Sequence, residues 1–77
     1  MLTPSQIRAA RALVGWSQAD VAAAAGLSIP TVKRAESDVG VRVSEDAIAT
    51  IGSVLKKAGV EFIEENGGGP GVRLWKR

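Results

Sequence analysis

The chain has 77 residues and a mass of 8.0 kDa, which is enough for one small domain but not for two separate hydrophobic cores. It contains no cysteine and no histidine, so disulfides and thiolate chemistry are excluded, and the commonest metal ligand and general base is absent. Hydrophobic residues make up 45% of the chain and charged residues 23%, which is typical of a folded soluble domain. Composition therefore argues against most catalytic chemistries, and we expect no enzyme activity, metal site or cofactor.

The net charge of +2 is distributed unevenly along the chain. Residues 1–34 have a net charge of +3, residues 35–65 of −4 and residues 66–77 of +3. This uneven charge distribution predicts that one surface of the protein binds a polyanion. No apolar run approaches the ~18 residues of a membrane span, and the first residues lack the pattern of a secretory signal, so we expect a cytoplasmic protein without a membrane partner.

Helix-start signals predict a first helix over residues 4–14. Thr3, Pro4 and Gln6 form a capping-box pattern, with proline at the first helical position, where its missing N–H costs nothing. Gly15 supplies a left-handed stop. The predicted inward positions are Ile7, Ala10, Leu13 and Val14, which recur at helical spacing.

Two shorter helices are predicted next. Ser17 caps the first of them, with Asp20 three residues later, and Gly26 ends it. Ser28 caps the second, which fades near Ser37. The predicted inward positions are Val21, Ala22 and Ala25 in the first of these helices and Val32 and Ala35 in the second.

A loop over residues 38–43 precedes a fourth predicted helix. Ser44 opens this helix with two acidic residues behind it, as the helix dipole prefers, and Gly59 ends it. Its predicted buried stripe is Ala47, Ile48, Ile51, Val54, Leu55 and Ala58. Beyond it, two apolar segments separated by a glycine-rich stretch predict a β-hairpin with strands over residues 60–63 and 72–75.

An isolated hairpin is marginal in water, so these strands need cover. Strand alternation predicts that Phe62 and Leu74 pack on the fourth helix near Leu55. Ile63 and Trp75 then form an apolar patch on the other side, and the hairpin is predicted to build a homodimer through these four residues. In the competing arrangement, Trp75 folds over the glycine loop and the dimer forms through the fourth helix.

Residues 17–36 have the layout of a helix-turn-helix. Ala22 is small where the two helices must cross closely, and Gly26 takes the turn conformation between them. Opposite the inward positions, spacing places four residues on one outer face, which a DNA major groove would contact: Ile29, Pro30, Lys33 and Arg34. Lys33 and Arg34 alone would also fit an ordinary solvated helix face.

Residues 4–36 resemble the Xre family of helix-turn-helix regulators, the class of the phage Cro and repressor proteins. The matching residues are Ile7, Arg11, Leu13, Gly15, Trp16, Ser17, Gln18, Ala22, Gly26, Ser28, Val32 and Glu36. With the fourth predicted helix, the resemblance implies a mainly α fold: a four-helix repressor-like helix-turn-helix domain over residues 1–59. The C-terminal β-hairpin arm predicted over residues 60–77 departs from the usual five-helix form of the family. This hairpin is similar to the C-terminal arm of some small bacterial members.

The resemblance also assigns residues to DNA contact. Gln18 matches a residue that binds a phosphate and braces the recognition helix, and Ser17 beside it offers its own N–H to the DNA backbone. The other implied DNA-binding residues are Ser28, Ile29, Pro30, Thr31, Lys33 and Arg34. Because Ile29 and Pro30 donate no side-chain hydrogen bonds, base specificity is expected from Lys33 and Arg34, with thymine-methyl contacts from Ile29.

Arg11 and Glu36 match a buried ion pair that ties the first helix to the end of the third, although as a sequence pair they would also fit two unpaired surface charges. The implied function is a sequence-specific transcriptional regulator, most simply a dimeric repressor on a palindromic operator of double-stranded DNA. The alternative is an antitoxin-like or other protein-binding module that acts on a protein partner through its C-terminal tail.

Overall fold

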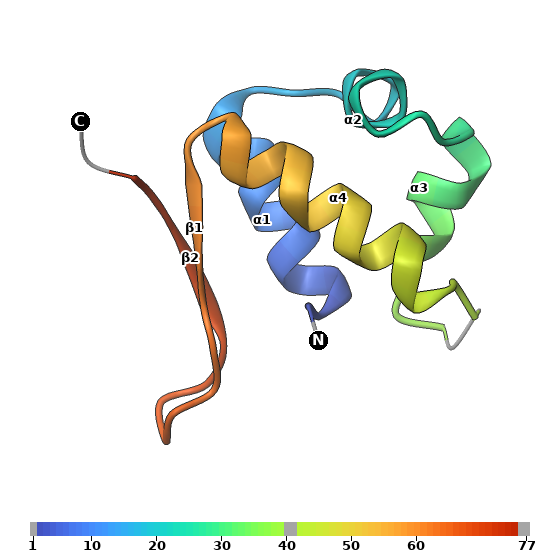
Figure 1. Cartoon of the computed structure of the whole chain (residues 1–77). Helices are drawn as coiled ribbons and strands as arrows, with labels where there is room; N and C mark the ends of the chain where they lie inside the picture. Colours follow the sequence, from blue (N-terminus) through green and yellow to red (C-terminus); the bar gives the residue numbers. More distant parts are fainter. Residues whose placement is uncertain (1, 40–41, 76–77) are drawn as a thin grey trace.

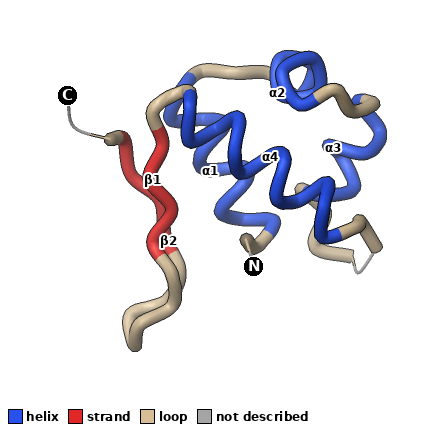
Figure 2. The backbone as a smooth tube through the Cα atoms, in the orientation of Figure 1, coloured by secondary structure: helices blue, strands red, loops and turns tan. Residues whose placement is uncertain are grey.

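The computed structural model describes residues 2–39 and 42–75, and over these ranges it contains four helices followed by a two-stranded antiparallel hairpin (Figures 1 and 2). The elements are α1 (Pro4–Val14), α2 (Gln18–Ala25), α3 (Ile29–Ala35), α4 (Glu45–Lys57), β1 (Val60–Ile63) and β2 (Gly71–Leu74). The predicted fold class is therefore confirmed. Part of the predicted loop over residues 38–43 lies outside the described residues. Within the described ranges, no helix is both long and apolar enough to cross a membrane.

The helix ends follow local capping chemistry, as predicted. At the start of α2, the Ser17 hydroxyl accepts the Asp20 N–H at 3.0 Å, and the Ser17 N–H donates to the Asp20 carboxylate at 2.9 Å. Gly15 and Gly26 end α1 and α2 with φ of 69° and 68°, in the left-handed region that glycine enters without steric cost. Serine hydroxyls also cap the first turns of α3 and α4.

The hydrophobic core lies between the four helices and the first strand. Its largest fully buried side chains are Ile7, Val21, Val32, Ile51 and Leu55, and small buried residues at Ala10, Ala22 and Ala35 let the helices approach closely. One predicted inward position is wrong, because Leu13 is exposed. Leu13 lies at the margin of the stripe that Ile7, Ala10 and Val14 define, since each residue advances about 100° around a helix.

The hairpin pairs Val60 with Leu74 and Phe62 with Val72. β2 begins and ends one residue earlier than predicted, so Trp75 lies just beyond the strand. Phe62 and Val72 pack against the helical core. The prediction that Leu74 packs on α4 is wrong, because this residue is 54% exposed. The reason is that β1 lies against both α1 and α4, whereas β2 lies mainly against α1.

A buried glutamine holds the hairpin to α1, a role beyond the capping box predicted for it. Gln6 is 5% exposed, and its Nε2 donates to the carbonyl oxygens of Ile63 at 3.1 Å and Gly71 at 3.0 Å. Its Oε1 accepts the N–H of Thr3 at 2.9 Å. Since Ile63 and Gly71 are paired across the hairpin, one amide fixes both strands at the end nearest the glycine loop. The boundary at residue 59 stays a prediction, but Val60 belongs to the shared core.

Candidate nucleic-acid interface

The structure packs α2 against α3 through small and branched apolar side chains. Val21 and Ala22 of α2 and Val32 of α3 are buried in the shared core. Figure 1 shows that α2 and α3 lie on one side of α1 and α4, and the hairpin on the other. The two short helices therefore present their outer faces away from the hairpin.

The predicted outer face of α3 is exposed. Ile29, Pro30, Lys33 and Arg34 all lie at the surface. Within the described residues Lys33 and Arg34 enter no ion pair, and α3 itself contains no acidic residue. Two cations without an ion-pair partner among the described residues can meet phosphate oxygens or the acceptor atoms of guanine.

Ser28 and Thr31 lie at the start of the same helix. The Ser28 hydroxyl accepts the Thr31 N–H at 3.2 Å and lies 2.8 Å from the Thr31 hydroxyl. Ser28 is exposed and Thr31 half-buried. Both side chains therefore have a fixed position beside the exposed face, while each hydroxyl still has capacity for another hydrogen bond.

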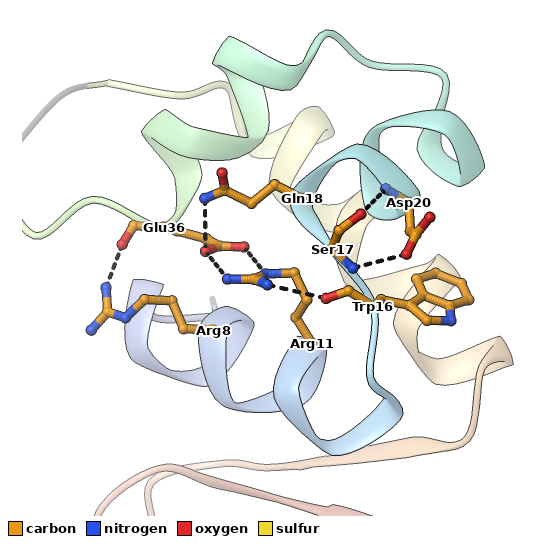
Figure 3. A network of polar contacts seen from close by, with 7 residues as sticks. All are labelled: Arg8, Arg11, Trp16, Ser17, Gln18, Asp20 and Glu36. Carbon is orange, nitrogen blue, oxygen red and sulfur yellow. Dashed lines mark hydrogen bonds and ion pairs between the residues drawn. The ribbon is translucent and has the colours of Figure 1, made fainter.

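The predicted pair of Arg11 and Glu36 is present and bidentate (Figure 3). Arg11 Nε and Nη2 lie 2.8 Å and 3.1 Å from the two carboxylate oxygens of Glu36. The Glu36 side chain is 4% exposed and that of Arg11 25%. Hydrogen bonding to Glu36 raises the pKa of the Arg11 guanidinium despite the opposite effect of its partial burial. This ion pair joins α1 to the residue that ends α3.

Arg8 also contacts the end of α3, and the sequence analysis did not predict this contact. Its Nη1 donates to the backbone carbonyl of Glu36, and its Nη2 donates to Asp38 at 3.1 Å. The last carbonyls of a helix have no hydrogen-bond donor within that helix. Arg8 supplies a cationic donor to one of them at the C-terminal end of the seven-residue α3. The signal was available in principle, since Arg8 and Arg11 are three residues apart and share one face of α1.

Gln18 and Ser17, both assigned to DNA contact, have intramolecular partners. Gln18 Nε2 donates to the Glu36 carboxylate at 3.2 Å, which holds the amide beside the end of α3 (Figure 3). Its amide retains a second N–H and a carbonyl oxygen for other partners. The Ser17 N–H is already donated to Asp20, so a phosphate contact from Ser17 would compete with the capping box. These DNA contacts stay predictions.

Two short helices that cross at a glycine turn, with the second carrying an exposed basic face, define a helix-turn-helix DNA-binding protein. The family model described as Helix-turn-helix, of the Cro/C1 type, matches residues 7–62. Because this match covers most of the chain, the protein belongs to this Xre-like family, as its resemblance implied. It is accordingly a DNA-binding regulator in the general sense. No curated protein matches the chain.

Proposed function

We propose that the protein is a cytoplasmic, dimeric repressor that reads a palindromic operator by placing α3 in the DNA major groove. The observation that carries this proposal is the exposed face of α3, which presents Lys33 and Arg34 on a helix without acidic residues. A repressor acts by occupying a promoter, so it needs affinity and sequence preference but no catalytic group.

In this proposal the residues of the interface have different roles. Arg34 and Lys33 contact guanine acceptors or flanking phosphates, and Ile29 contacts thymine methyl groups. Gln18 binds a phosphate and, through Glu36, fixes the position of α3 on the DNA backbone. The remaining predicted contacts, from Ser17, Ser28, Pro30 and Thr31, position the helix rather than select bases.

A dimer is proposed because one recognition helix reads only about four or five base pairs, which are too few to select a genomic site. The hairpin supports this assignment, since Leu74 is 54% and Trp75 61% exposed. Phe62, which lines a hollow together with Trp75, is half-buried, as is Ile63 at the opposite end of the strand pair. Exposed apolar side chains at the end of a two-stranded sheet are typical of a surface that a partner covers.

The experiment is an operator selection from random DNA, followed by binding titrations with two variants. Arg34→Ala should weaken binding to the selected site by about 5- to 150-fold and relax the preference at one position. Lys57→Ala removes the same charge from an exposed position of α4 and serves as the matched control. Unchanged affinity of Arg34→Ala would refute the assigned role of α3. A selected site without two-fold symmetry would refute the dimeric mode of binding.

The exposed Leu74 and Trp75 also support the second candidate, a protein-binding module such as an antitoxin that acts through its C-terminal tail. A pull-down with the full chain, carried out beside the DNA titration, separates the two. A stable heterologous partner together with no selectable DNA site would favour the module over the repressor.

A further inference from the structure

A groove of about 860 Å³ lies between α4, the hairpin and the residues before α1. Leu2, Ile48 and Phe62 contribute apolar surface to it, while Glu45, Glu64 and Glu65 contribute carboxylates. Across the described ranges, none of these three glutamates is in an ion pair. Lys56 is a cation in the same lining, so the groove combines apolar surface with a net negative charge.

The walls of this groove are held in place by the fold. Gln6, which also lines it, ties both strands to α1 through its two hydrogen bonds to strand carbonyls. On α4, Gly52 makes room for the Leu2 side chain, because a Cβ at that position would lie 2.8 Å from Leu2 Cδ1. A groove with fixed walls loses little conformational freedom when it is filled.

Trp75 lies beside the groove on the same face of the molecule. It lines a smaller hollow together with Lys56 and Phe62, and both of these residues also line the groove. Trp75 is 61% exposed, while its backbone N–H donates to the carbonyl of Gly59 at 2.6 Å. An exposed tryptophan and an open apolar groove thus share one surface.

We propose that each copy of a homodimer inserts Trp75 into this groove of the other copy. The inference rests on the dimer of the proposed function and names the surface that receives the tryptophan. A two-fold interface requires the inserted tryptophan and the receiving groove to lie on one face of each chain. They do so here, because Lys56 and Phe62 line both the groove and the hollow of Trp75. Donor and receptor on opposite faces would instead lead to an open chain of copies.

Charge favours a second copy of this chain as the occupant. In the sequence, Trp75 is followed by Lys76 and Arg77, which lie outside the described residues. A segment that combines an aromatic residue with two cations complements a groove that combines apolar surface with Glu64 and Glu65. The pairing also brings together the negative middle and the positive end of the chain.

Complementation between two variants tests the exchange in the full chain without DNA. Trp75→Ala removes the donor, and Ala49→Trp fills the groove from an exposed position that lines it. Each variant alone should dimerise at least tenfold more weakly than the wild type in sedimentation experiments. Their equimolar mixture should form heterodimers, detected by native mass spectrometry, because one copy retains the groove and the other retains the tryptophan. Ala12→Trp, at an exposed position of α1 outside the groove, is the matched control.

A charge reversal keeps the proposal testable if Ala49→Trp fails to fold, as judged by circular dichroism. Glu64→Lys combined with Glu65→Lys changes exposed residues between the strands and should weaken the dimer. Mixing that variant with a Lys76→Glu, Arg77→Glu variant should restore association. A monomeric wild-type chain, wild-type dimer affinity in Trp75→Ala, or the absence of heterodimers in both mixtures would overturn the inference. A dimer with these properties that selects no DNA site would instead overturn only the proposed function.

Discussion

Replacing Arg11 by alanine should destabilise the protein strongly, because it leaves the Glu36 carboxylate buried without its cation. The substitution removes two hydrogen bonds to Glu36, at 2.8 Å and 3.1 Å, and a third to the carbonyl of Trp16. Gln18 remains as a neutral donor to Glu36. Breaking a buried ion pair on one side costs about 3–5 kcal/mol. Since the Arg11 side chain is 25% exposed and water screens it in part, we expect a loss of about 2–4 kcal/mol.

Urea denaturation followed by circular dichroism measures this loss directly. In a domain of this size, the expected change lowers Tm by roughly 10–25 °C. Arg73→Ala is the matched control, because it also breaks an arginine–glutamate pair, but Arg73 is 64% exposed and its loss should change the stability little. Combining Arg11→Ala with Glu36→Gln should recover part of the loss, since no unpaired charge then remains. A loss below about 0.5 kcal/mol for Arg11→Ala would show that the pair behaves as an exposed one.

Three further predictions follow from individual contacts. Gln6→Ala should lower the free energy of unfolding by about 1–3 kcal/mol, because two strand carbonyls lose their hydrogen-bond donor. It should also speed hydrogen exchange of the strand amides, and unchanged exchange would contradict this role of Gln6. Gly26→Ala should cost about 1–2 kcal/mol in thermal unfolding from backbone strain alone, since φ is 68° and no atom lies near the added methyl group. The hydrogen bond from Arg73 lowers the pKa of Glu61, so the Arg73→Ala variant should raise the Glu61 pKa in an NMR titration. This pair stabilises the fold above the ordinary glutamate pKa, and that stability is lost as the pH falls through the lowered pKa of Glu61. A Glu61 titration curve that is unchanged in Arg73→Ala would contradict the prediction.

The helix boundaries could be predicted because they depend on neighbouring residues. The hydroxyl of Ser17 and the glycine at position 15 act within one turn of the helix that they begin or end, so their pattern in the sequence is sufficient. The ion pair of Arg11 with Glu36 was accessible only through the family resemblance, because 25 residues separate its members.

The contacts of the hairpin could not be predicted in the same way. Strand alternation tells which residues share a face, but not which helix that face meets, and Leu74 was therefore placed on α4 although β2 packs against α1. Gln6 satisfied a local capping pattern, and nothing in the sequence indicated that its amide also reaches the two strands. Arg8 was likewise missed because its partners follow α3.

α1 connects the proposed DNA-binding surface to the proposed dimer surface. Near its start, Gln6 holds both strands of the hairpin, and further along, Arg8 and Arg11 hold the residue that ends α3. Gln6 and Arg11 are about 7.5 Å apart along the axis of this one continuous helix. Under the proposed dimer, the contact made by the hairpin therefore fixes the separation of the two recognition helices without any flexible joint. Because that separation determines the half-site spacing, changes in the hairpin should alter the preferred operator spacing, whereas changes on α3 should alter the preferred bases.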